Sequence, residues 1–269
     1  MISIVGCGWL GNHLAGYLRS KKSTVFGSTT RQSQCDILRS IGVIPCILTV
    51  SDDGEVSCDT PKLFEVSTLV ITLPFRRSFE DPHVYFKQIK GLVDTYLANT
   101  SQKKRIIFTS STSVYSLTNS MVYEDDKIIP SSDRQQVLLD VEAYLLSLKE
   151  IDTTILRCAG LYGYDRRIAK FLSNKVVSNK LAPVNLIHVD DVVGIFDLIL
   201  NKPLDHSIFN CVVNHHPSKE TLYNYYTQKE CLPPPRFCDE DKQTSYKIVS
   251  NELLVNVYNY SFKYPRLFD

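Results

Sequence analysis

Three glycines near the start of the chain have a spacing that can bind phosphate. They are Gly6, Gly8 and Gly11, in the pattern G-x-G-x-x-G, and they follow an apolar run at residues 2–5 that predicts a buried strand. Residues 12–20 then carry apolar side chains at helical spacing. In such a unit the first glycine permits the tight turn, the second lets a pyrophosphate approach the backbone, and the third lets the helix pack closely. We predict a dinucleotide site here, with a glycine-rich turn that binds nothing as the alternative.

A group of hydroxyl side chains forms a second candidate site. Residues 105–108 predict a buried strand, and residues 109–116 (T-S-S-T-S-V-Y-S) follow it directly. In parallel α/β sheets, ligands bind at the carboxyl ends of the strands. The position of these hydroxyls therefore indicates that they contact a ligand.

The end of the second predicted strand bears on the choice of dinucleotide. Residues 24–26 predict this strand, and residues 27–31 (G-S-T-T-R) follow it. An acidic residue near this point would bind the ribose 2′-hydroxyl of NAD, but the chain has Thr30 and Arg31 here. Because arginine binds phosphate through charge-assisted hydrogen bonds, we predict NADP rather than NAD. The alternative is that Arg31 is an ordinary exposed arginine.

The elements that must position these residues alternate between strand and helix. Such alternation predicts an α/β fold, a doubly wound parallel sheet (Rossmann fold) of about seven strands, with a small C-terminal lobe. We expect the Rossmann domain over residues 1–160, with 185–213 returning to it, and the substrate lobe over 161–184 and 214–269. The further predicted strands are 44–50, 68–73, 153–157 and 208–213, and the further predicted helices are 33–40, 81–98, 132–149, 190–200 and 218–230.

Composition narrows the class of partner. The 269 residues carry a net charge of +1, which gives no reason to expect binding to nucleic acid or to a membrane surface. No apolar run reaches membrane-spanning length, and a strand beginning at residue 2 leaves no room for a signal peptide, so we expect a cytoplasmic protein. The eight cysteines form no C-x-x-C pair, which indicates free thiols and no bound metal. The expected partner is a small molecule.

Four motifs together resemble one family. They are residues 6–11 (G-C-G-W-L-G), 109–116, 156–163 (L-R-C-A-G-L-Y-G) and 185–191 (N-L-I-H-V-D-D). Their order and spacing are similar to those of the extended short-chain dehydrogenase/reductases, and the chain most resembles the atypical NAD(P)-dependent epimerase/dehydratase-like members. The resemblance covers essentially the whole chain. It implies an oxidoreductase or epimerase/dehydratase-like enzyme that acts on a small hydroxyl, carbonyl or nucleotide-sugar-like substrate.

The resemblance also implies roles for particular residues. Ser111 matches the family's catalytic serine, whose hydroxyl would hydrogen-bond a substrate carbonyl or hydroxyl. The helices at 82–98 and 132–149 are faces that pair in family homodimers. The residues implied for cofactor binding are Gly6, Gly8, Trp9, Leu10, Gly11, Thr30, Arg31, Leu73, Pro74 and Ala159. Those implied for the substrate cleft are Tyr115, Arg134, Tyr162, Arg166 and His188, with packing as the alternative for His188 and helix capping expected for Asp190 and Asp191.

The chain departs from the family at the catalytic Tyr-x-x-x-Lys pair. When the motif is aligned on Glu142, Arg134 takes the tyrosine's place and Leu138 the lysine's. The tyrosine hydroxyl transfers a proton, and the lysine lowers its pKa. Arginine stays protonated and cannot do this work.

A tyrosine elsewhere could act as the acid instead. The spacing recurs at Tyr17/Lys21, Tyr123/Lys127 and Tyr225/Lys229. Only Tyr123 lies shortly after Ser111, although its acidic surroundings favour an ordinary loop tyrosine. Two functions therefore stay open. The chain is either an enzyme with non-standard catalytic residues, or a non-catalytic NADP(H)-binding sensor or regulatory module.

Overall fold

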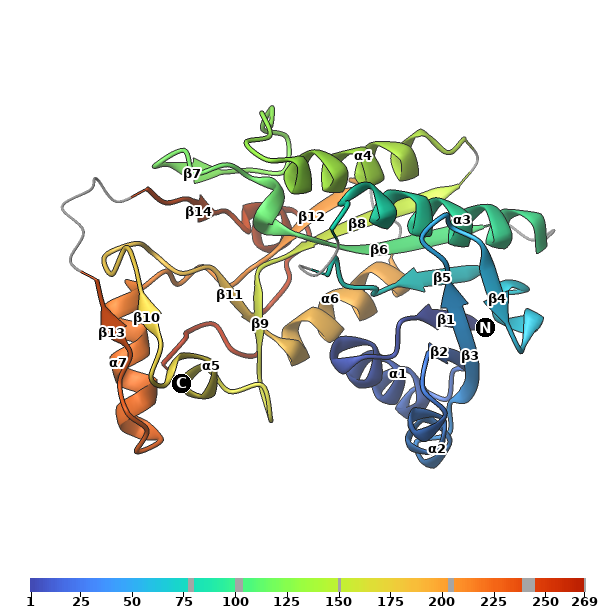
Figure 1. Cartoon of the computed structure of the whole chain (residues 1–269), viewed down its shortest axis with the longest axis horizontal. Coiled ribbons are helices and arrows are strands. Elements are labelled where there is room, and N and C mark those ends of the chain that lie inside the picture. The colour runs from blue at the N-terminus through green and yellow to red at the C-terminus, as the bar shows by residue number, and fades with distance from the viewer. Residues whose placement is uncertain (77–79, 100–103, 150, 203–205, 239–244, 269) are drawn as a thin grey trace. The chain divides into compact units, whose positions relative to one another are not determined.

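The computed structural model in Figure 1 describes residues 1–76, 80–99, 104–149, 151–202, 206–238 and 245–268. Residues 239–244 and 269 of the predicted lobe lie outside these ranges. By internal packing the chain divides into two units. The first comprises Met1–Ser110, Pro130–Leu156 and Leu204–Ile208, and the second comprises Ser111–Ile129, Arg157–Pro203 and Phe209–Asp269. The predicted lobe segments 161–184 and 214–269 fall in the second unit, and so does most of 185–213, which was expected in the Rossmann domain.

An eight-stranded, mostly parallel sheet runs in the order β12-β8-β6-β5-β1-β2-β3-β4. Its strands are β1 (Ile2–Val5), β2 (Val25–Thr29), β3 (Ile44–Val50), β4 (Val56–Cys58), β5 (Thr68–Ile71), β6 (Arg105–Ser111), β8 (Asp152–Cys158) and β12 (Ile208–Cys211). Strand β1 pairs in parallel with β2 on one side and with β5 on the other. The predicted doubly wound α/β fold is confirmed, with eight strands in the sheet rather than about seven.

Helices cover both faces of the sheet in the first unit. They are α1 (Trp9–Ser20), α2 (Gln32–Ser40), α3 (His83–Asn99) and α4 (Asp133–Ser147), and the 3-10 turn η1 (Pro61–Phe64) lies between β4 and β5. Figure 1 shows α3 and α4 on one face, and α1 and α2 on the other. The strands between them are buried on both sides, as Ile4, Val70 and Ile107 are fully inaccessible to solvent. Burial on both faces explains why these strands form continuous apolar runs in the sequence.

Several strands and helices differ from the prediction in their bounds. Strand β2 continues past residue 26 to Thr29, and its Gly27 pairs with Pro45 of β3. Only a glycine fits closely at position 27, because a Cβ there would lie 2.7 Å from the Cys7 sulfur. Strand β6 continues to Ser111, so the first hydroxyl residues belong to the strand. The antiparallel strand β4 was not predicted; at three residues, it is too short to show a period.

The second unit contains short elements. Its strand pairs are β7 (Met121–Val122) with β14 (Ile248–Val249), β9 (Gly160–Tyr162) with β11 (Leu186–His188), and β10 (Val176–Val177) with β13 (Arg236–Phe237). Its helices are α5 (Ile168–Leu172), α6 (Val189–Asn201) and α7 (Lys219–Lys229), with the 3-10 turn η2 (Thr112–Val114) and the π-helical turn η3 (Leu253–Val257). Ser218 caps α7 by accepting the Thr221 N–H at 3.1 Å, as predicted.

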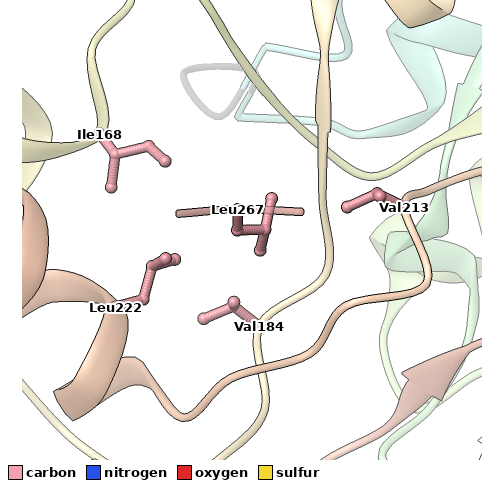
Figure 2. Packing of buried hydrophobic residues seen from close by; sticks show 5 residues of the cluster. All are labelled: Ile168, Val184, Val213, Leu222 and Leu267. Atoms are coloured by element: carbon pink, nitrogen blue, oxygen red, sulfur yellow. The ribbon is translucent and has the colours of Figure 1, made fainter. Parts of the chain in front are cut away.

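A separate hydrophobic core holds the second unit together. Figure 2 shows that Ile168, Val184, Val213, Leu222 and Leu267 point toward one another. Leu267 is fixed at both backbone groups, because its N–H donates to His215 Nδ1 at 2.9 Å and its carbonyl accepts from the Tyr226 hydroxyl at 2.7 Å. The C-terminal tail is thus part of this core.

Within the part of the chain that the structure describes, no helix is both long enough and apolar enough to cross a membrane.

Candidate functional site

The glycine turn after β1 is crowded at two glycines and open at the third. A Cβ on Gly6, whose φ is +101°, would lie 2.9 Å from the Leu73 side chain. A Cβ on Gly11 would lie 2.5 Å from the Gly6 carbonyl oxygen. A Cβ on Gly8 would meet no atom within 4 Å. The turn and the helix contact therefore need Gly6 and Gly11, whereas Gly8 leaves space beside the backbone that a pyrophosphate group could fill.

Two hydroxyl residues hold this turn in shape. Ser28 Oγ accepts the Gly6 N–H at 3.0 Å, and its backbone carbonyl accepts the Cys7 N–H at 2.8 Å. From the other side, Thr72 Oγ1 donates to the Gly6 carbonyl at 2.7 Å. Neither Ser28 nor Thr72 was predicted as a site residue. Their only signal is a polar side chain at or beyond the end of an apolar strand.

The start of α1 is suited to an anion. Among the described residues no side chain caps its first turn, where Gly8 is the N-cap, and that turn contains no acidic residue. Trp9 and Leu10 are its first two residues, and the Trp9 ring packs edge-on to His13 at 5.1 Å. The first N–H groups of a helix lack intrahelical partners and lie at the positive end of its dipole. The open glycine and the uncapped helix together fit the pyrophosphate of a dinucleotide.

Thr30 and Arg31 lie between β2 and α2. The Arg31 N–H donates to Thr29 Oγ1 at 3.2 Å, which fixes the backbone there. The Arg31 side chain is exposed, and among the described residues it forms no ion pair. It is available to a ligand phosphate.

Arg134 anchors the segment that follows β5. Its guanidinium group donates to the carbonyls of Phe75 at 3.1 Å and Arg76 at 3.0 Å, and it lies over the Phe75 ring. The other face of this ring stacks on Tyr85, whose hydroxyl donates to the Leu73 carbonyl at 2.9 Å. The segment that contains the predicted cofactor residues Leu73 and Pro74 is thus held by side chains from α3 and α4.

The two serines at the end of β6 have different roles. The Ser110 hydroxyl donates to Glu142 Oε1 at 2.5 Å, and both residues are buried. Ser111 is half-buried, and its Oγ accepts the Ser113 N–H at 3.1 Å. Among the described residues the Ser111 O–H has no acceptor, so it can donate to a ligand oxygen.

Tyr115, predicted in the substrate cleft, belongs to a buried polar network. Its hydroxyl donates to Asn210 Oδ1 at 2.8 Å and accepts from the Arg157 guanidinium at 2.8 Å. Glu124 Oε1 accepts the Asn210 N–H at 2.9 Å. Burial raises the pKa of Tyr115 to about 12 and also raises the pKa of Glu124. The phenol therefore stays protonated at neutral pH.

The alternative Tyr/Lys pairs lie in different settings. Tyr123 and Lys127 lie in the turn after β7 rather than on a helix, as predicted, and the Tyr123 hydroxyl contacts the Met121 sulfur at 3.2 Å. Tyr225 lies on α7 and donates its hydroxyl to the Phe268 carbonyl at 2.8 Å. Tyr17 lies near the end of α1, where the Lys21 ammonium packs over its ring. The catalytic role of Tyr123 stays a prediction.

His188 lies at the centre of an aromatic group with the rings of Tyr162, Tyr164 and Tyr264. The ring centroids lie 5.1, 5.7 and 3.8 Å from that of His188, respectively. His188 is buried, and a Cβ on Gly163 would lie 2.6 Å from its Nε2. The structure thus brings two of the predicted cleft residues, Tyr162 and His188, into contact.

The capping of α6 differs from the prediction. His188 is the N-cap, because its Nδ1 accepts the Asp190 N–H at 3.2 Å. Asp191 instead accepts the N–H groups of Lys263 at 2.6 Å and Tyr264 at 3.1 Å, while Asp190 pairs with the Lys263 ammonium at 2.6 Å. The expectation that both aspartates cap the helix was wrong, since the chain's tail uses their carboxylates.

The remaining site residues lie on the loops around β8 and β9. The Ala159 N–H donates to the Cys211 carbonyl at 3.0 Å, and Ala159 is buried. Arg166 forms an antiparallel bridge with Gly163. The backbone is therefore fixed at Ala159 and at Arg166.

The cysteines are free thiols, and most are buried. Burial raises the pKa of Cys7 and of Cys46 to about 12, so neither forms a thiolate at neutral pH. Within the described ranges, no group of His, Cys, Asp and Glu side chains could hold a metal ion.

Comparisons with known proteins identify the family. Residues 2–211 match the model of the NAD dependent epimerase/dehydratase family. The chain is 34% identical to Protein YeeZ of Escherichia coli K12 over 267 residues, which cover 98% of this chain and 96% of that protein.

The UDP-glucose 4-epimerase of Thermotoga maritima has a TM-score of 0.77 at 14% identity, covering 98% of this chain and 94% of that one. The UDP-glucuronic acid 4-epimerase of Bacillus cereus, in complex with NAD, has a TM-score of 0.76 at 16% identity, covering 100% and 93%. The chain belongs to the NAD-dependent epimerase/dehydratase family, in agreement with the resemblance found in its sequence.

Proposed function

We propose that this protein is an NADP-dependent enzyme of the epimerase/dehydratase type. Its substrate is a small hydroxyl or carbonyl compound related to the nucleotide sugars. A nicotinamide dinucleotide, when bound, accepts or returns a hydride. The protein's own residues hold the dinucleotide, orient the reacting oxygen and manage its proton.

The glycine turn is the observation that carries this proposal. The only open position among its three glycines is Gly8, directly before a helix that no described side chain caps. Pyrophosphate needs both features, namely room beside the backbone and N–H groups that are free to donate. Ser28 and Thr72 hold the turn in this shape without a ligand. Trp9, Leu10, Leu73, Pro74 and Ala159 complete the proposed cofactor site, and Thr30 with Arg31 would bind the 2′-phosphate.

Ser111 is the proposed catalytic residue. Its oxygen already accepts a backbone N–H, so its proton is directed elsewhere and can hydrogen-bond a substrate oxygen. The proton that this oxygen gains on reduction needs a donor other than Arg134. Tyr123 remains the proposed surrogate, and Tyr162, Arg166 and His188 remain the proposed substrate contacts.

The second candidate function is a sensor that binds NADP(H) and does no chemistry. The specific observation in its favour is the use of the Tyr-x-x-x-Lys positions for structure. Arg134 is held by two backbone carbonyls, and Leu138 is buried in the core. Neither residue can transfer a proton.

Calorimetric titration with NADPH and NADH tests the cofactor. We expect NADPH to bind at least tenfold more tightly, and Arg31→Ala to abolish that preference by weakening NADPH alone. Arg39→Ala is the matched control, because Arg39 is an exposed arginine on α2, the helix that follows Arg31, and it pairs with Asp36. Equal binding of both dinucleotides by the wild-type protein would contradict the NADP assignment.

Turnover separates the enzyme from the sensor. A panel of nucleotide sugars and small carbonyl compounds, followed by NADPH absorbance and by product analysis, should contain a compound that the wild-type protein converts. We expect Ser111→Ala to lose at least 100-fold in kcat/KM, while Ser120→Ala, at an exposed serine, retains activity. Tight NADPH binding with no turnover of any panel member would favour the sensor.

The cellular location and the oligomeric state of the protein are also part of the proposal. Eight cysteines with free thiols are typical of a protein in a reducing compartment, and this supports the proposed location in the cytoplasm. A homodimer through α3 and α4 is proposed by analogy with the family. Sedimentation of the wild-type protein at several concentrations tests it, and a single monomeric species would contradict it.

A further inference from the structure

Lys247 is a half-buried lysine of the second unit. Its ammonium group donates to the backbone carbonyl of Tyr115, four residues after Ser111. Among the described residues it has no other hydrogen bond and no ion pair. Because an ammonium group has three N–H donors, two of them are available to a ligand.

The backbone around Lys247 is fixed on both sides. The Tyr246 N–H donates to Asn119 Oδ1 at 2.8 Å, and the Ile248 N–H donates to the Ser120 carbonyl at 3.0 Å. Asn185 donates its side-chain amide to the Lys247 carbonyl at 3.0 Å. Strand β14 then pairs with β7 directly after the lysine. The ammonium group is thus presented from an ordered backbone, which reduces the entropy lost when a ligand binds.

Folding alone does not account for this lysine. Burial lowers its pKa to about 8, so the protein forgoes part of the hydration of a charged group and gains one hydrogen bond. Among the described residues no carboxylate forms an ion pair with Lys247, and the Glu124 carboxylate accepts the Asn210 N–H instead. Arg157 is bound at the other end of Tyr115, at the hydroxyl.

We propose that Lys247 binds an anionic group of the substrate, a phosphate or a carboxylate, while Ser111 holds the reacting oxygen. The inference rests on the proposed function, because it takes Ser111 as the catalytic residue. Both residues belong to the second unit, and the short turn η2 joins Ser111 to the carbonyl that Lys247 contacts. The sequence gives little warning of this role, since Lys247 is one lysine beside a short apolar pair.

The direct test measures the ionisation of Lys247 by NMR, with labelled lysine side chains in the full-length protein. Inorganic pyrophosphate and sodium glucuronate are added separately, with and without NADPH, and glucose is the neutral control. We expect one of the two anions to raise the pKa of Lys247 by at least half a unit, because a bound anion favours the charged amine. A response to pyrophosphate would identify a phosphate site, and a response to glucuronate would identify a carboxylate site.

Lys219 provides a matched control within the same unit. It is also half-buried, donates to a backbone carbonyl, that of Ser178 at 3.1 Å, and has a pKa lowered by burial. We expect its ionisation not to respond to either anion. If neither anion affects Lys247, or if both lysines respond equally, the proposal is overturned.

Variants separate this inference from the proposed function. Lys247→Gln should weaken binding of the responding anion at least fivefold, Lys247→Arg should retain it, and neither should change NADPH affinity. Equal anion binding by wild-type protein and Lys247→Gln would overturn the anion site. Loss of the proposed function appears differently: NADPH does not bind, or no panel compound is converted, while the Lys247 response to the anion persists.

Discussion

The Arg134 guanidinium group lies over the Phe75 ring, with its central carbon 3.9 Å from the ring centroid. Phe75 stacks in turn on Tyr85, at 4.5 Å between centroids. This three-layer stack, together with the two carbonyl hydrogen bonds of Arg134, fixes the chain just after β5. Arg134, which was predicted to stand at the family's tyrosine position, is therefore a structural clamp. Any proton transfer must be done by another residue.

Removing this clamp should reduce stability. We expect Arg134→Ala to lower the free energy of unfolding by about 1–3 kcal/mol, because two charge-assisted hydrogen bonds and a cation–π contact are lost. Arg134→Lys should recover only part of that loss, since an ammonium group cannot stack and make both bonds. Urea denaturation measures the effect. Stability equal to wild type in both variants would show that the clamp contributes nothing.

The open and crowded glycines should respond oppositely to alanine. Gly8 has φ −82° and free space at its Cβ position, so Gly8→Ala should change unfolding free energy by less than about 0.5 kcal/mol. The added methyl group fills the space proposed for pyrophosphate, and we expect NADPH affinity to fall at least tenfold. Gly11→Ala should lose about 2 kcal/mol or more of stability, because its Cβ would collide with the Gly6 carbonyl.

Calorimetry and urea denaturation of both variants test these expectations together. If Gly8→Ala binds NADPH as tightly as wild type, the pyrophosphate does not approach at Gly8. If Gly11→Ala is as stable as wild type, the helix can shift away from the turn.

Local pattern predicted the sheet, but it could not predict contacts made across the chain. Strands β1 and β5 were each predicted from a continuous apolar run, and the structure pairs them in parallel. Ser28 and Thr72 hold the glycine turn from 22 and 66 residues away, and no period in the sequence connects them to it. Arg134 likewise reaches carbonyls 58 and 59 residues away.

The helix cap at α6 shows a different limit. Two aspartates at the start of a helix normally indicate capping, and the prediction followed that preference. In the structure the tail at residues 260–264 provides the donors for Asp191, and His188 serves as the cap. A preference estimated from neighbours in sequence fails where a distant segment competes for the same carboxylate.

Asp191 should matter more to the tail than Asp190. Asp191 is buried and its carboxylate accepts two backbone N–H groups, whereas the Lys263 partner of Asp190 is 64% exposed. We expect Asp191→Ala to cost about 2–4 kcal/mol, because buried donors are left unsatisfied, and Asp190→Ala to cost at most about 1 kcal/mol. Hydrogen exchange of the Lys263 and Tyr264 amides measures the local effect. Equal protection in both variants would contradict this ranking.

Lys247 should make stability depend on pH. Burial lowers its pKa in the folded state from the ordinary value of 10.5 to about 8, so between these values the unfolded state binds more protons and wild-type stability rises with pH. Below about pH 8 the penalty for the buried charge is fully present.

Lys247→Met removes this titration. Relative to wild type, the variant should therefore gain about 1–2 kcal/mol at pH 7 compared with pH 10.5, a figure discounted for the partial exposure of the side chain. Urea denaturation at both pH values measures the difference, with Lys62→Met at an exposed position as control. A stability difference between Lys247→Met and wild type that stays constant with pH would mean that the Lys247 ammonium is fully hydrated in the folded protein.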